Sequence, residues 1–140
     1  MPSTPLDIRY RVGNDLDLDE VISVYLDSTL GMRRPVDERD RMKQMLETAN
    51  LVISAWDGER MVGISRSLSD FCFCTYLSDL AVRRSYQRKG IGRELMRRTQ
   101  EAGGRATVFL FAAPAAEAYY PHVGFRAGSG WILGDGDRLR

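Results

Sequence analysis

Apolar residues recur with helical spacing in two early segments of the chain. The first set occupies positions i, i+3, i+4, i+7 and i+8, one face of a helix: Leu18, Val21, Ile22, Tyr25 and Leu26. Asn14 or Asp15 can cap this helix, and Gly31 is expected to end it. A second stripe predicts a helix that starts near Asp37 and contains Met42, Met45, Leu46 and Ala49. A short, half-apolar strand over residues 8–12 is expected before both helices.

The middle of the chain has the pattern of a β-hairpin followed by a longer strand. Residues 51–56 and 61–68 flank Asp57-Gly58, a pair that favours a tight hairpin turn. Residues 71–82 form a long run rich in aromatic and β-branched side chains, which predicts a strand covered on both faces. We therefore expect several strands here, the first two of them antiparallel.

The last third of the chain alternates between helices and strands. Residues 91–102 have a helical stripe that ends at Gly103-Gly104, with Ile91, Leu95, Met96, Thr99 and Ala102 facing inward. Residues 106–112 read as a buried strand, residues 114–122 as a short helix, and residues 131–133 as a final strand. A helix between two buried strands predicts a β-α-β crossover, so the sheet as a whole is expected to be mixed.

Length and composition are those of one ordinary globular domain over residues 1–140. Hydrophobic residues make up 44% and charged residues 28% of the chain, which argues against disorder. No apolar run approaches the roughly 18 residues of a membrane span, and residues 1–7 lack a secretory signal pattern. The only cysteines, Cys72 and Cys74, are badly spaced for a framework disulfide. We therefore expect a cytoplasmic protein without a membrane partner.

The positive charge of the chain is concentrated at one place. From Arg83 to Arg98 there are seven basic residues and one acidic residue, a net charge of +6, whereas the whole chain carries +1. This segment joins a buried strand to a helix and contains Gly90 and Gly92, which let a ligand approach the backbone closely. Unpaired N–H groups and the partial positive charge of the helix start favour an anion, most naturally a phosphate.

Established phosphate and nucleic-acid motifs do not fit this segment. It lacks the Gly-x-x-x-x-Gly-Lys-Ser/Thr string of a P-loop, and Leu95 stands where a dinucleotide fingerprint needs glycine or alanine. A DNA-binding surface would spread its basic residues over one face rather than around a glycine turn. A solvated basic helix start is the alternative interpretation of the charge run alone.

The longer string around the glycines resembles motif A of the GNAT acyltransferase superfamily. It reads Leu80-Ala81-Val82, Gln87-Arg88-Lys89-Gly90-Ile91-Gly92 and Leu95, and Gln87, Gly90 and Gly92 fill the signature Gln/Arg-x-x-Gly-x-Gly/Ala. Downstream, Ala116, Tyr120, Gly124 and Phe125 resemble the last helix and the Tyr-x-x-x-Gly-Phe ending of that family. The resemblance implies an α/β (α+β) GNAT acyl-CoA N-acyltransferase fold: a central mixed, mostly antiparallel sheet flanked by about four helices.

The resemblance also implies acetyl-CoA, or a related acyl-CoA, as co-substrate. The backbone from Arg88 to Arg93 would hold the pyrophosphate, and the backbone of Leu80 and Val82 would pair with the pantetheine arm. The expected cofactor-binding residues are Leu80, Ala81, Val82, Gln87, Arg88, Lys89, Gly90, Ile91, Gly92 and Arg93. The family's asparagine near the last helix is missing, because the chain reads Ala112-Ala113-Pro114-Ala115 there. No metal ion is expected.

Two residues are candidates for the proton transfers of acyl transfer. Tyr120 matches the tyrosine that the family places near the CoA sulfur, where a phenol can donate a proton at neutral pH. Asp79 lies within a buried strand and could accept a proton through water; the equal alternative is that it binds backbone or an arginine. The only histidine, His122, is more simply structural.

The implied function is transfer of an acetyl group to a primary amine of a small molecule or peptide, by direct attack in a ternary complex. A non-catalytic acyl-CoA sensor is the main alternative, and nucleic acid is not expected as a partner. Arg33 and Arg34 could recognise an acidic acceptor or simply be exposed. A homodimer is an expectation from the family alone.

Overall fold

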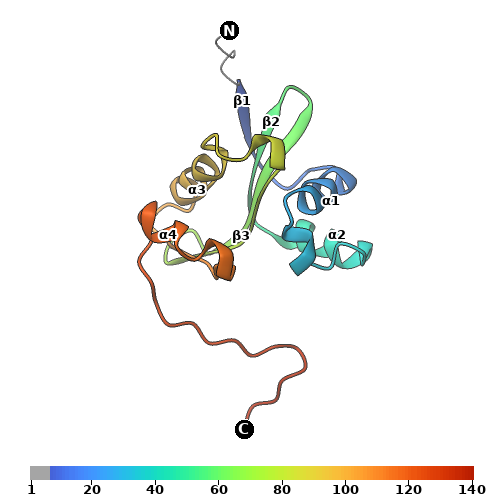
Figure 1. Cartoon of the computed structure of the whole chain (residues 1–140). Helices are drawn as coiled ribbons and strands as arrows, with labels where there is room; N and C mark the ends of the chain where they lie inside the picture. The colour runs from blue at the N-terminus through green and yellow to red at the C-terminus, as the bar shows by residue number, and fades with distance from the viewer. Residues whose placement is uncertain (1–6) are drawn as a thin grey trace. The chain divides into compact units, whose positions relative to one another are not determined.

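The computed structural model describes residues 7–140 (Figure 1). The chain separates into two compact units, one extending to Leu110 and the other running from Phe111 to Arg140. Each unit is described by itself. No helix among the described residues is long and apolar enough to cross a membrane.

The first unit is built on a five-stranded sheet in the order β1-β2-β3-β4-β5. Its strands are β1 (Ile8–Val12), β2 (Leu51–Asp57), β3 (Arg60–Ser69), β4 (Cys74–Val82) and β5 (Thr107–Phe109). The first three junctions are antiparallel, and β5 pairs in parallel with β4 after a crossover through one helix. The predicted mixed sheet and the late β-α-β crossover are both confirmed.

Three helices of the first unit cover the two faces of this sheet. Figure 1 shows α1 (Leu18–Asp27) and α2 (Arg39–Thr48) on one face and α3 (Ile91–Ala102) on the other. The larger apolar cluster joins α1 and α2 to the sheet, and the smaller one joins α3 to it through Ile91 and Leu95. The helix expected over residues 91–102 is confirmed at both ends, although Ala102 is exposed.

Strand β4 has different neighbours along its two halves. Its parallel pairing with β5 runs only from Cys74 to Tyr76, whereas its pairing with β3 continues to Val82. Within the described chain, the second half of β4 therefore has no strand on its β5 side. The register against β3 also shifts: Leu77 faces Ser67 and Asp79 faces Arg66, so Ser78 is an extra residue that forms a β-bulge.

The ends of the first helix differ from the sequence expectation. Asp17, rather than Asn14 or Asp15, caps α1, because its Oδ2 accepts the Glu20 N–H at 3.1 Å. The helix ends at Asp27, before Gly31, because Thr29 has a φ of 75° that turns the chain into the short 3₁₀ helix η1 (Leu30–Arg33).

Two strands of the first unit are shorter than predicted. β4 starts at Cys74 because Asp70 Oδ1 accepts the N–H groups of Cys72, Phe73 and Cys74, which folds residues 71–73 into a turn. β5 covers only residues 107–109 of the predicted 106–112, and it is largely exposed rather than buried. Both differences follow from local hydrogen bonds or missing neighbours that an apolar run does not reveal.

The second unit contains two short helical segments and an extended end. The helix expected over residues 114–122 is split into η3 (Pro114–Ala116) and α4 (Tyr119–His122). The strand expected over residues 131–133 is not formed, and Trp131 is 91% exposed. A strand needs a neighbour for its backbone hydrogen bonds, and none lies within residues 111–140 of this unit.

Candidate active site

The start of α3 has the geometry of an anion site. Gly90 caps the helix with a φ of 84°, and a Cβ built on it would meet no atom within 4 Å. The first turn has no side-chain cap, and the first hydrogen bond inside the helix runs from Glu94 N–H to the Gly90 carbonyl at 3.0 Å. The N–H groups of Ile91, Gly92 and Arg93 precede that bond and are left for an outside acceptor.

The loop before α3 is tied to the end of β4. The short 3₁₀ helix η2 (Arg84–Tyr86) opens the loop, and the Gln87 Nε2 donates to the Val82 carbonyl at 2.9 Å. Arg88 has a φ of 62°, so two of three consecutive residues around Lys89 adopt left-handed backbone. The turn that bears Gly90 is therefore anchored to the strand end by a side chain.

The structure divides the basic residues of this segment into three groups. Arg83 is buried, with its Nε donating to the Met61 carbonyl at 2.7 Å, so it serves the fold. Arg97 and Arg98 pair with Glu94, and the hydrogen bond from Arg97, followed by that from Arg98, lowers the pKa of Glu94 to about 2. Four exposed cations around the glycine turn have no ion-pair partner within residues 7–140: Arg84, Arg88, Lys89 and Arg93.

The end of β4 lies against the start of α3. Ala81 is buried, whereas Leu80 and Val82 are partly buried and pack on the apolar cluster under α3. Gly63, opposite Val82 in β3, permits this packing, since a Cβ there would lie 3.2 Å from the Leu95 side chain and 3.3 Å from that of Ile91. Sequence reasoning did not single out Gly63; a glycine inside a predicted strand was the available signal.

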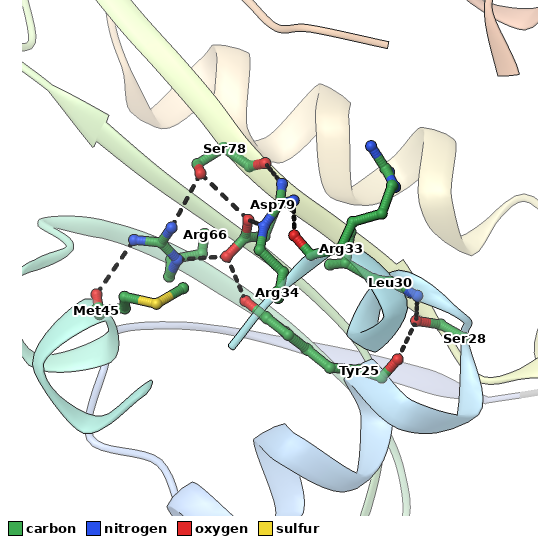
Figure 2. A network of polar contacts seen from close by, with 9 residues as sticks. All are labelled: Tyr25, Ser28, Leu30, Arg33, Arg34, Met45, Arg66, Ser78 and Asp79. Carbon is green, nitrogen blue, oxygen red and sulfur yellow. Dashed lines mark hydrogen bonds and ion pairs between the residues drawn. The ribbon is translucent and has the colours of Figure 1, made fainter. Parts of the chain in front are cut away.

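Asp79 is the centre of a buried polar network (Figure 2). Its Oδ2 accepts the Tyr25 hydroxyl at 2.7 Å and the Arg66 Nε at 2.5 Å, and its Oδ1 accepts the Arg34 Nε at 2.5 Å and the Ser78 hydroxyl at 3.2 Å. The Asp79 side chain is fully buried. Of the two alternatives, the contacts are those of a carboxylate that binds arginines.

Charge balance in this network lowers the proton affinity of Asp79. Burial alone would raise the pKa of this carboxyl, but the hydrogen bond and charge of Arg66, then Tyr25 and Arg34, outweigh burial and lower the pKa. Burial and the neighbouring Asp79 also raise the pKa of Tyr25 well above its usual value. A carboxylate held in this way accepts a proton less readily than a free one, which favours the second alternative; its role as the base stays a prediction.

Tyr120 belongs to the second unit, at the second position of α4. Its ring lies edge-on to those of Tyr119 and Phe125, with centroids 5.4 and 5.5 Å apart, and its carbonyl accepts the Phe125 N–H at 2.9 Å. The aromatic rings of the predicted Tyr-x-x-x-Gly-Phe segment therefore pack against one another within the second unit. Tyr120 and Asp79 lie in different units. Among residues 7–140, no three His, Cys, Asp or Glu side chains are grouped to hold a metal ion.

The sequence matches an established family over most of its length. The model of the acetyltransferase (GNAT) domain family matches residues 31–136. The chain belongs to the GNAT acetyltransferase family. The match spans the glycine turn, the second half of β4 and the Tyr120 segment, so the GNAT resemblance read from these residues is confirmed.

A curated relative agrees with this GNAT assignment. An uncharacterised N-acetyltransferase of Prochlorococcus marinus, described as ycf52-like, is 31% identical over 117 residues. The alignment covers 79% of the present chain but 63% of that relative. The chain thus spans less than two thirds of the relative's length.

Solved structures show the same GNAT fold. A GNAT-family acetyltransferase from Streptococcus pneumoniae is 26% identical, with a TM-score of 0.72 over 89% of this chain and 97% of its own. A Deinococcus radiodurans protein described as a putative acetyltransferase has a TM-score of 0.75 at 20% identity, covering 96% and 92%. An aminoglycoside N-acetyltransferase solved with CoA has a TM-score of 0.70 at 16% identity, covering 95% of each chain. The expected GNAT acyltransferase fold is confirmed.

Proposed function

We propose that this protein is an N-acetyltransferase that transfers the acetyl group of acetyl-CoA to a primary amine of a small molecule or peptide. The observation that carries the proposal is the glycine turn at Gly90. Its helical N–H groups lie among four cations without an ion-pair partner in residues 7–140, beside the half of β4 that has β3 but no strand on its other side there. The arrangement fits a long ligand with a pyrophosphate at one end and an amide-bearing arm along a strand.

The residues of the first unit suit this ligand in chemistry and in space. The backbone from Arg88 to Arg93 would bind the pyrophosphate, with Gly90 and Gly92 leaving room for it. Arg84, Arg88, Lys89 and Arg93 offer positive charge for the ribose phosphate. The backbone of Leu80, Ala81 and Val82 would pair with the pantetheine arm, while Gln87 and Ile91 hold the loop and the helix start in place.

Acetyl-CoA, when bound, supplies a thioester whose acyl group a neutral amine can accept. The backbone N–H near Val82 would polarise the thioester carbonyl. Tyr120 would hold the proton that the leaving thiolate requires, because a phenol is protonated at neutral pH. Since Asp79 is held by two arginines, we assign removal of the amine proton to water rather than to a carboxylate.

Relatives support this proposal at the level of reaction class. One aminoglycoside N-acetyltransferase with the same fold was solved with CoA and with a CoA-linked acetylneamine analogue. The proposal treats residues 1–140 as one catalytic domain, acting in the cytoplasm on a soluble amine. Pairing of two copies remains part of the proposal on family grounds alone.

Calorimetric titration with acetyl-CoA tests the binding half of the proposal. We expect micromolar affinity, weaker binding of 3′-dephospho-acetyl-CoA, and a loss of at least about tenfold in Gly90→Glu and Gly92→Glu, equivalent to about 1.4 kcal/mol. Gly136→Glu is the matched control: it adds the same charge in the second unit, where a Cβ meets nothing within 4 Å. Equal effects of all three substitutions would reject the glycine turn as the binding site.

Tyr120→Phe tests the chemical half. We expect a large loss of turnover across an amine panel with unchanged acetyl-CoA affinity, because the substitution removes the hydroxyl that would supply the proton and keeps the ring. Tight acetyl-CoA binding with no turnover of any amine by the unaltered protein would instead indicate a sensor. Salt-sensitive binding of DNA that acetyl-CoA does not displace would indicate a nucleic-acid role.

A further inference from the structure

Ser78, the bulged residue of β4, is held from two sides by arginines (Figure 2). Arg34 donates its Nη2 to the Ser78 carbonyl at 2.7 Å, and Arg66 donates its Nη2 to the Ser78 hydroxyl at 2.9 Å. Each arginine also donates its Nε to Asp79, the next residue. Both guanidinium groups therefore bridge two consecutive residues at the bulge, and we refer to Arg34, Arg66 and Asp79 as the bulge clamp.

The bulge clamp joins β4 to the helices on one face of the sheet. Arg34 directly follows η1, and its Nη1 donates to the Arg33 carbonyl at 2.8 Å. Arg66 belongs to β3 and donates its Nη1 to the Met45 carbonyl in α2 at 3.2 Å. With the Tyr25 hydroxyl, the Asp79 carboxylate is bound by side chains from α1, from β3 and from the residue that follows η1, and Arg66 extends the network to α2.

The position of the bulge connects this network to the proposed donor site. Ser78 lies two residues after Tyr76, where pairing with β5 ends, and two residues before Leu80. A β-bulge bends its strand and increases the local twist, so its geometry sets the direction of the backbone beyond it. The half of β4 from Leu80 to Val82 has a strand partner on one side only within the described residues, and the bulge clamp fixes where that half begins.

We propose that Arg34 is a positioning residue for acyl transfer: by holding the Ser78 carbonyl and Asp79 together, it fixes the backbone of Leu80, Ala81 and Val82 that would bind the acyl donor. This inference rests on the proposed function. In this proposal the effect of Arg34 passes through the bulge rather than through a contact with substrate. The side chain is 20% exposed and is engaged by three acceptors, which distinguishes it from Arg33, whose side chain is exposed.

An arginine suits this position because its Nε and Nη2 donate side by side to two acceptors, the Asp79 carboxylate and the Ser78 carbonyl. A guanidinium has donors in a fixed planar fork, so Nε can bind the carboxylate while Nη2 binds the carbonyl. A lysine ammonium is a point charge on a flexible stem without this fixed pair of donors, so it would keep the attraction to Asp79 but hold the Ser78 carbonyl less firmly. Compared with Arg34→Ala, Arg34→Lys should therefore keep a positive charge beside Asp79 but should not hold the bulge in its native geometry.

The experiment compares Arg34→Ala, Arg34→Lys and the neighbouring control Arg33→Ala. We expect Arg34→Ala to lower kcat/KM roughly 10- to 100-fold, as a displacement of about 1 Å at a reacting centre does, mostly through kcat. Arg34→Lys should recover only part of this loss, and Arg33→Ala should match the unaltered protein. Met42→Ala, which truncates a buried apolar residue of the α1–α2 cluster and removes no hydrogen bond of the bulge clamp, controls for lost stability.

Hydrogen exchange supplies a readout that does not depend on turnover. In Arg34→Ala, the amides of residues 77–82 should exchange faster, while those of α3 stay as they are; Met42→Ala should not show this selective change. If Arg34→Ala behaves like Arg33→Ala in both measurements, or like Met42→Ala in both, the positioning role is wrong. If the unaltered protein acetylates no amine, the proposed function fails, and exchange alone decides whether Arg34 fixes the bulge.

Discussion

The side-chain amide of Gln87 donates to the carbonyl of Val82 at 2.9 Å and joins the basic loop to the end of β4. This bond links the two parts of the proposed donor site, the strand that would pair with the pantetheine arm and the turn that would hold the pyrophosphate. Both residues were expected to contact the ligand on the basis of the GNAT motif. The structure shows that the Gln87 side chain also has a partner within the protein, and its contact with the ligand stays a prediction.

Gln87→Ala should therefore weaken acetyl-CoA binding without a direct contact being lost. A typical hydrogen bond contributes about 1 kcal/mol, which corresponds to roughly a fivefold rise in Kd. Titration calorimetry measures this change, and Gln100→Ala, an exposed glutamine of α3, is the matched control. An unchanged Kd in Gln87→Ala would show that the loop keeps its shape without this bond.

Asn14 stabilises the end of α2 rather than the start of α1. Its Nδ2 lies 3.3, 3.1 and 3.1 Å from the carbonyl oxygens of Leu46, Glu47 and Ala49, which have no further turn of helix to bind them. Asn14→Ala should lower the free energy of unfolding by about 1–2 kcal/mol. Urea denaturation checks this value, and a loss below a few tenths of a kcal/mol would contradict it.

Asp17 and Asp15 should respond differently to the same substitution. Asp17 caps α1 through the Glu20 N–H, whereas Asp15 is exposed and has no side-chain hydrogen bond among the described residues. Asp17→Ala is expected to cost about 1 kcal/mol of stability, and Asp15→Ala almost nothing. Thermal unfolding of the two variants side by side measures the difference; equal melting temperatures would reject the cap.

Asp79 should make stability depend on pH in the acid range. Its pKa is lower in the folded protein than its ordinary value of about 4, so its contribution is present above that value and is lost as pH falls toward the folded-state pKa. Unfolding free energies at pH 7, 5, 4 and 3 should show this decline. Asp79→Asn should be less stable at pH 7 and should have a shallower decline below pH 5. Parallel curves for both proteins would contradict the assignment.

The sequence predicted those elements whose signals are local. The stripe from Ile91 to Ala102 ends in Gly103-Gly104 and defined α3 at both ends, and Asp57-Gly58 defined the β2–β3 hairpin. Gly90 was correctly placed at a turn because a residue between a strand and a helix often needs positive φ. These features depend on residues that are close together along the chain.

Features that depend on distant partners were missed or misplaced. Asp79 drew attention as a buried acid, but its partners Tyr25 and Arg34 could not be read from the sequence, so two roles remained open. The apolar run at residues 131–133 predicts a strand, yet strand formation depends on a neighbour rather than on composition. The start of β4 was placed too early because the turn at Asp70 is made by side-chain hydrogen bonds.

The bulge clamp also has a consequence for the order in which the protein folds. Arg66 and Asp79 are 13 residues apart on neighbouring strands, whereas Arg34 and Tyr25 reach Asp79 across 45 and 54 residues. Closing the 13-residue loop between Arg66 and Asp79 costs less chain entropy than closing the longer ones. The β3–β4 pair can therefore form first, and α1 with the segment that carries Arg34 docks onto it later. Arg34→Ala should then accelerate unfolding while leaving the refolding rate almost unchanged in stopped-flow measurements. The Asp79 carboxylate would form its ion pair with Arg66 early in folding and its ion pair with Arg34 only at the end.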